Sequence, residues 1–159
     1  MRGEAANSGD HTVANAKGIY NELLGYFATR QDKLFVIITA PPLAEGETDA
    51  AAAANARAFN RWLVEDWLSE YPHDNVAVFD FYNVLTSSGG DPETSDLGSE
   101  SGNHHRYRDG QIEYVTDQGD DHAAYAWEGD SHPTAAGGRK ASAEFIDILN
   151  LAYARWRSS

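Results

Sequence analysis

Apolar side chains recur at helical spacing in three parts of the chain. In residues 16–27 they fall at i, i+3, i+4 and i+7, which is the pattern of an amphipathic helix, and Thr12 stands where it can cap the first turn. A second helix is expected over residues 50–71 and a last one over residues 134–156. Their apolar stripes are expected to be Phe59, Trp62, Leu63 and Trp67 in the second, and Ala141, Phe145, Ile148, Leu149, Ala152 and Trp156 in the last.

Two further segments are apolar without helical spacing. Residues 34–40 read LFVIITA, which is typical of a central strand in a parallel sheet that has helices on both faces. Residues 75–85 read NVAVFDFYNVL and predict a second strand, with Val76 and Val78 in the core and Asp80 near its carboxyl end. This order of elements predicts an α/β fold with right-handed crossovers, in which ligands bind beyond the carboxyl ends of the strands.

Residues 86–129 show no strong periodicity apart from a weak alternation in QIEYV, at residues 111–115. A segment of this length within one domain is more often functional than idle, so we interpret it as a long functional loop. Two strands are few for an open sheet. Three explanations stay open: the long segment supplies more strands, a partner chain completes the sheet, or the chain is part of a larger fold. We expect one α/β domain over residues 1–159, with a flexible N-terminus at residues 1–11.

Composition narrows the range of partners. The net charge of −13 disfavours nucleic acid and anionic membranes, because both attract clustered Lys and Arg. No apolar run approaches the roughly 20 residues that a membrane span needs. The absence of cysteine excludes disulfides, a cysteine nucleophile and thiolate metal sites. The first residues lack the apolar stretch of a signal peptide, and the compartment stays open.

The stretch GDSHPT, at residues 129–134, places an acid and a histidine directly before the last helix. A histidine can act as a general base near neutral pH, and a nearby carboxylate can orient its ring. Asp130 and His132 are therefore candidate catalytic residues, and Pro133 restricts the backbone of His132 to extended conformations. The alternative is structural: Asp130 caps the helix or pairs with Arg139, and His132 is a surface residue.

From about residue 13 onward the chain resembles the C-terminal half of the SGNH (GDSL-like) hydrolase family. The resemblance rests on DKLFVIITAPPL, on NARAFNRWL with NVAVFDFYNVL, and on GDSHPTAAGGRKASAEF. It implies a three-layer α/β/α flavodoxin-like sandwich that is truncated at its N-terminus relative to the family. It also implies hydrolysis of short carboxylic esters, including carbohydrate acetyl esters, by a serine nucleophile. His132 would be the base and Asp130 the acid.

Several residues of the family pattern have no clear counterpart. The family's acid lies three residues before the histidine, where this chain has Gly129, so Glu128, Asp120 and Asp121 are reserve candidates. The nucleophile block is absent, since the letters NSGD at residues 7–10 follow no apolar strand. An activated water is one substitute for the nucleophile. The serines considered as substitutes are Ser87, Ser88, Ser99, Ser101 and Ser131, and the asparagines considered for the oxyanion site are Asn7 and Asn15.

Histidines and carboxylates also gather in the second half of the chain, a composition that suits a divalent cation. Their spacing matches no established ligand pattern, and we assign no metal and no cofactor. The second hypothesis for function is a non-catalytic remnant, or a carbohydrate-binding or metal-binding domain. Because a thin sheet leaves an open edge that a second copy can cover, we also expect a homo-oligomer. The residues of the cluster are His104, His105, Asp120, Asp121, His122, Glu128, Asp130 and His132.

Overall fold

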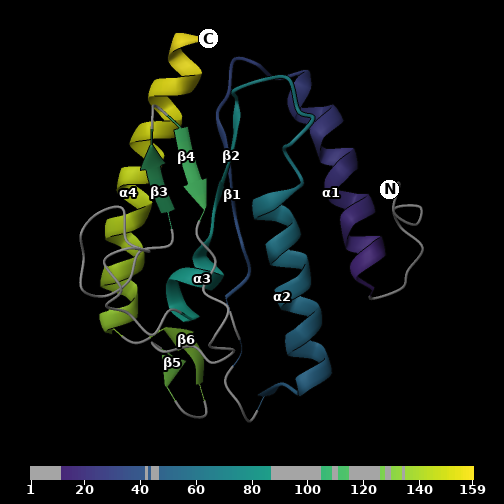
Figure 1. Cartoon of the computed structure of the whole chain (residues 1–159), viewed down its shortest axis with the longest axis vertical. Coiled ribbons are helices and arrows are strands. Elements are labelled where there is room, and N and C mark those ends of the chain that lie inside the picture. Colours follow the sequence, from purple (N-terminus) through teal and green to yellow (C-terminus); the bar gives the residue numbers. More distant parts are fainter. Residues whose placement is uncertain are drawn as a thin grey trace.

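The computed structural model of the chain describes residues 12–41, 43, 47–86, 105–108, 111–114, 126–127, 130–133 and 135–159. The elements, in chain order, are α1 (Val13–Ala28), β1 (Phe35–Ile38), α2 (Ala50–Glu65), β2 (Val76–Phe79), α3 (Phe81–Thr86), β3 (His105–Arg108), β4 (Gln111–Tyr114), β5 (Ala126–Trp127), β6 (Asp130–Pro133) and α4 (Ala135–Ser158) (Figure 1).

A parallel pair of strands lies at the centre of the described structure. β1 pairs with β2 in parallel, with Phe35 opposite Val76 and Ile38 opposite Phe79. Helices α1 and α2 lie on one side of this pair and α4 on the other (Figure 1). The predicted α/β class is confirmed at this level: helices pack on a small parallel sheet.

Two apolar clusters fill the space between the sheet and the helices. On the α1 and α2 side, Phe27, Leu63 and Trp67 pack with Val76 and Val78 of β2. On the α4 side, the cluster joins β2, α3 and α4 through Phe79, Val84, Ala141 and Ile148. Val76 and Val78 of the second predicted strand are therefore in the core, and the predicted stripes of α2 and α4 face the sheet. Burial of these side chains is the main stabilising contribution.

The first helix begins where the sequence predicts. Thr12 is its N-cap, and the Thr12 hydroxyl accepts a hydrogen bond from the backbone N–H of Asn15 at 3.1 Å. This bond satisfies one of the N–H groups that a helix leaves unpaired in its first turn. Asp49 caps α2 in the same way, accepting from the N–H of Ala52 at 2.7 Å.

The predicted strand over residues 75–85 is wrong in its second half. β2 ends at Phe79, and the chain turns at once into α3. The N–H of Val84 donates to the carbonyl of Asp80, and the N–H of Tyr82 donates to the Thr39 hydroxyl. These bonds use the backbone donors that a longer strand would need. A continuous apolar run does not distinguish a buried strand from a strand followed by a short buried helix.

The second helix is also shorter than the predicted 50–71, because it ends at Glu65. The backbone N–H groups of Asp66 and Trp67 both donate to the carbonyl of Trp62, which closes the helix. The turns that follow keep Trp67 in the core, where its indole Nε1 donates to the carbonyl of Tyr20 at 3.2 Å. The predicted buried position of Trp67 is therefore right, although the helix has already ended.

The segment interpreted as one long loop contains short strands. β3 and β4 form an antiparallel pair, and the weak alternation in QIEYV corresponds to β4. β5 and β6 form a second antiparallel pair. Among the described residues, these strands pair with each other and do not extend the β1–β2 sheet. The predicted N-terminal segment, 1–11, lies outside the described residues. No helix in the described ranges combines the length and apolar character of a membrane span.

Candidate functional site

The carboxyl ends of β1 and β2 carry a buried polar pair. Thr39 follows β1 and Asp80 follows β2, and both are essentially inaccessible to solvent. The Thr39 hydroxyl lies 3.5 Å from Asp80 Oδ1 and accepts a hydrogen bond from the N–H of Tyr82 at 2.8 Å. The hydroxyl therefore joins the end of one strand to the first turn of the helix that follows the other.

Asn60 adds a second polar contact at the end of β1. Its side-chain Nδ2 donates to the carbonyl of Ala40 at 3.0 Å. Asn60 is 3% exposed, and its Oδ1 has no hydrogen-bond partner among the described residues. A buried acceptor without a donor costs free energy, so Asn60 marks a place where a donor group would be stabilising.

A second buried carboxylate comes from α4. Glu144 is 2% exposed. It lies between Ala141 and Ile148, which pack on the end of β2 and on α3. Sequence reasoning did not select Thr39, Asn60 or Glu144. The only signal was Glu144 itself, an acidic residue at the position between two members of the predicted apolar stripe.

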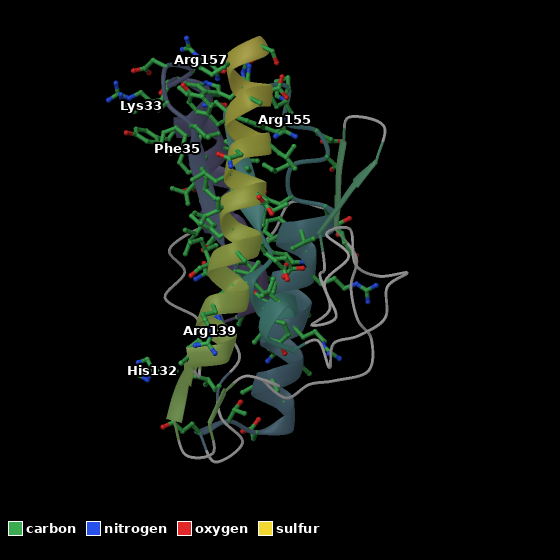
Figure 2. The ribbon with its side chains drawn as sticks, turned by 90° about the vertical axis from the view of Figure 1, so that its left-hand side faces the viewer. Lys33, Phe35, His132, Arg139, Arg155 and Arg157 are labelled. Atoms are coloured by element: carbon green, nitrogen blue, oxygen red, sulfur yellow. The ribbon has the colours of Figure 1, made fainter. Side chains whose placement is uncertain are left out.

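His132 lies at the same end of the molecule as the carboxyl ends of β1 and β2. It belongs to β6, directly before α4, and its side chain is exposed. β5 and β6 lie beyond α3 at the foot of the sheet (Figure 1), and Figure 2 shows His132 at that end, beside Arg139. Open parallel sheets bind their ligands at this end of the strands.

The strand that carries His132 is irregular. Ala126 pairs with Pro133, whereas the next residue, Trp127, pairs with Asp130. Ser131 and His132 therefore lie between two partner positions that are consecutive on β5, so the pairing register shifts at these two residues. A shift of register redirects the side chains of the strand, as a β-bulge does. The sequence predicts extended backbone before Pro133, and β6 agrees with this prediction, but the shift arises from strand pairing, which the sequence does not predict.

The structure describes only some of the other predicted site residues. Asp130 and Ser131 are described as backbone positions of β6, so an Asp130 to His132 contact stays a prediction. Asn15 is buried on α1. The remaining predicted residues lie outside the described residues: Asn7, Ser87, Ser88, Ser99, Ser101, Asp120, Asp121 and Glu128.

The predicted metal cluster is likewise mostly beyond the described ranges, since His104, Asp120, Asp121, His122 and Glu128 all lie outside them. For His105, the structure describes only the backbone position in β3. Within the part of the chain that the structure describes, no group of three or more His, Asp or Glu side chains is arranged to hold a metal ion.

An open groove runs between α1 and the turns after α2, with a volume of about 1230 Å³. Aromatic rings meet polar groups there: the Lys17 ammonium lies 5.1 Å from the centre of the Trp62 ring, and Tyr71 contacts His73 edge-on. Burial raises the pKa of the Tyr71 hydroxyl, which donates to Asn75 Oδ1 at 2.9 Å. Sequence reasoning missed this groove because its two walls are far apart in the chain.

Comparisons with protein-family models, with curated proteins and with solved structures found no match for this chain.

Proposed function

We propose that the chain is a small ester hydrolase of the SGNH (GDSL-like) type, in which His132 is the general base. The observation that carries the proposal is the position of His132: exposed, in a strand of irregular register directly before α4, at the end of the molecule where the parallel strands end. The substrates would be short carboxylic esters, including acetyl groups on carbohydrates. Asp130 would orient the imidazole ring, and no metal or cofactor is required for this chemistry.

The finer description of the fold belongs to the same proposal. Helices on both faces of a parallel pair are compatible with a three-layer flavodoxin-like sandwich. In such a fold, His132 would remove the proton from a nucleophile as that nucleophile attacks the ester carbonyl, and would later donate the proton to the leaving alcohol. The nucleophile is a serine or an activated water. Ser87 and Ser88 are the first serines to test, because they directly follow α3, the helix that begins after the carboxyl end of β2.

The test is hydrolysis of p-nitrophenyl acetate and of the less activated phenyl acetate by the wild type and by His132→Ala. Histidines can hydrolyse activated esters without a built site, so His73→Ala, at a half-buried histidine outside β6, is the control. We expect His132→Ala to lose roughly a hundredfold or more of the activity on both esters, and His73→Ala to keep it. Equal activity in all three proteins on phenyl acetate would show that His132 is not the base.

The nucleophile and the acid need their own measurements. A fluorophosphonate label that depends on His132 would identify a serine, and peptide mapping would locate it. Turnover that depends on His132 without labelling would point to activated water. Asp130→Asn is expected to lower turnover by at least about tenfold, because the ring would lose its orienting carboxylate. If Glu128→Gln has the larger effect, Glu128 is the acid.

A second candidate function is a non-catalytic carbohydrate-binding domain, and the groove between α1 and the turns after α2 favours it. Trp62 and Tyr71 supply ring faces or edges, and Asn21 and Glu70 supply polar groups beside them. Titration with neutral oligosaccharides, followed by tryptophan fluorescence, tests this function. A saturable change that is lost in Trp62→Ala, together with no esterase activity, would favour binding over catalysis.

A further inference from the structure

In the part of the chain that the structure describes, no strand pairs with the edge of β1 that faces away from β2, and this edge carries backbone groups that β2 does not use. The N–H groups of Phe35 and Thr39 donate to β2, to the carbonyls of Asn75 and Phe79. In a parallel pair, alternate residues point their N–H and C=O groups to opposite sides. Val36 and Ile38 therefore direct their backbone groups away from β2. Unpaired strand edges of this kind are sites of strand pairing.

The opposite edge of the pair is covered differently. Val76 directs its carbonyl away from β1, and that carbonyl accepts a hydrogen bond from Arg155 Nη2 of α4 at 3.2 Å. Burial follows the same division: every residue of β2 is buried, whereas β1 is half-buried and its last residue, Ile38, is 51% exposed. Among the described residues, Arg155 thus covers the β2 side of the sheet, and no strand pairs with β1 on its other side.

Helix α1 presents apolar side chains along the open edge. Ile19 and Tyr26 are seven residues apart and so lie on one flank of the helix, and both are exposed. This flank is opposite the one that lines the groove with Lys17 and Asn21. The Tyr26 ring lies 6.2 Å from the ring of Phe35, the first residue of β1. The Ile19–Tyr26 flank therefore borders the strand edge on one face of the sheet.

Helix α4 borders the same edge on the other face. Its last turn is tied to the turn before β1, because Trp156 Nε1 donates to the carbonyl of Gln31 at 2.9 Å. Tyr153 contacts Trp156 edge-on and is 53% exposed. Val36 packs in the cluster beneath α4, and Ile38 shares that face of the strand. Figure 2 shows Phe35 at the same end of the molecule as Lys33 and Arg157.

We propose that this edge surface, consisting of Ile19, Tyr26, Ile38 and Tyr153 with the outer edge of β1, pairs with the same surface of a second copy of the chain. The two β1 strands run antiparallel about a two-fold axis and join the two sheets into one of four strands, ordered β2–β1–β1–β2. An isologous contact of this kind is the commonest form of homodimer. This inference is independent of the proposed ester hydrolysis.

The exposed area supports a second copy as the occupant. The four side chains expose roughly 350 Å² of apolar surface per copy, which is close to half of the about 800 Å² per partner in a standard interface. The strand backbone and the rest of the two helix flanks supply the remainder. Antiparallel pairing also keeps the exposed cations at the start of each β1, Lys33 and Arg157, at opposite ends of the contact.

The experiment is sedimentation equilibrium over a wide range of protein concentrations, at low and high NaCl. We expect a monomer–dimer equilibrium that tightens as salt is added, because each copy carries a net charge of −13 and salt screens their repulsion. A wild type that is monomeric at every concentration and salt level would overturn the proposal. A complex that forms only with a different polypeptide, and not with a second copy, would overturn it too.

Matched substitutions locate the contact. Ile38→Lys places a charge on the strand edge, a common natural protection against edge pairing, and we expect it to weaken dimerisation by at least about tenfold. Leu43→Lys is the control, since Leu43 is 50% exposed but lies after β1, beyond Pro41. It should leave the dimer unchanged. Equal weakening by both substitutions, or by neither, contradicts the assignment to the strand edge.

Two further readouts keep the test independent of folding defects. Ile38→Pro removes the outward N–H without adding charge and leaves the bonds of Phe35 and Thr39 to β2 in place. We expect a monomer whose circular dichroism matches that of the wild type. Hydrogen exchange of the Val36 and Ile38 amides should slow as the wild-type concentration rises. Exchange that does not depend on concentration would exclude pairing through this edge.

Discussion

The side-chain amide of Asn75 donates hydrogen bonds to the carbonyl of Phe27, at 2.9 Å, and to that of Arg30, at 3.1 Å. Asn75 directly precedes β2 and is completely buried, whereas Phe27 and Arg30 lie at the end of α1. One side chain thus donates to a carbonyl in the last turn of α1 and to a carbonyl in the turn that follows, and each of these also accepts a backbone N–H, from Arg30 and from Lys33. It also joins the amino ends of the two strands to α1.

Asn75→Ala should therefore be strongly destabilising. It removes two donors from buried or half-buried carbonyls and the acceptor of the Tyr71 hydroxyl. We expect the free energy of unfolding to fall by about 2–3 kcal/mol in urea denaturation. Asn55→Ala, at an exposed position of α2, is the control and should change stability by less than about 0.5 kcal/mol. Similar values for the two variants would contradict the role given to Asn75.

The raised pKa of Tyr71 leads us to expect a loss of stability at alkaline pH. Burial raises the pKa of its hydroxyl above the ordinary value of 10.0. The folded state therefore holds this proton more tightly than the unfolded state does. The stabilising contribution is fully present below pH 10 and is lost as the pH rises through the raised pKa of the folded state.

The measurement is urea denaturation of the wild type and of Tyr71→Phe at pH 8 and above pH 10. We expect the wild type to lose more stability than Tyr71→Phe between the two conditions, because phenylalanine does not ionise. Tyr71→Phe should also be less stable than the wild type at pH 8, by about 1 kcal/mol, since Asn75 loses a donor. Parallel loss in both proteins would show that other groups cause the alkaline sensitivity.

We expect the free energy of unfolding to depend more on the hydroxyl of Thr39 than on its methyl group. Thr39→Val keeps the shape but leaves the N–H of Tyr82 without its acceptor in a buried place. We expect it to cost about 1–3 kcal/mol in thermal or urea unfolding. Thr39→Ser keeps the acceptor and should cost less. A variant order in which Val is better tolerated than Ser would contradict the bond as the main contribution of Thr39.

Arg155 is expected to stabilise the covered edge of the sheet more through Val76 than through Asp74. Its Nη2 donates to the Val76 carbonyl, while its Nε lies 3.3 Å from Asp74 Oδ1, without the geometry of a hydrogen bond. Both side chains are more than a third exposed, so solvent screens the ion pair.

Urea denaturation of Arg155→Ala and of Asp74→Asn tests this difference. Arg155→Ala should cost about 1 kcal/mol, and Asp74→Asn less than about 0.5 kcal/mol. A double variant in which the two effects add would show that the pair itself contributes little. Strong coupling between them would show instead that the ion pair is the main interaction.

Some residues of the candidate site could be predicted from the sequence, and others are recognisable only in the structure. Asp130 and His132 are recognisable from their types and from their place before a helix. Thr39, Asn60 and Glu144 are not, because an ordinary polar residue becomes part of a site only when distant segments bury it. His132 shows both aspects: its identity is in the sequence, and its position at the end of the molecule where β1 and β2 end comes from packing.

The sequence by itself determined the local features. Apolar spacing determined the stripes of α2 and α4, a hydroxyl at Thr12 determined the start of α1, and the apolar runs determined where β1 and β2 begin. Each depends on residues within a few positions of one another, so local periodicity and capping are sufficient.

The tertiary structure alone decided where those elements stop and how they are joined. β2 ends at Phe79 because Thr39, 43 residues earlier than Tyr82, accepts the N–H that would otherwise remain free for a longer strand. Trp67 stays buried after α2 has ended because the carbonyl of Tyr20, 47 residues away, accepts its indole hydrogen. Such bonds form only after distant segments have packed together, and packing also decides which edge of the sheet Arg155 covers.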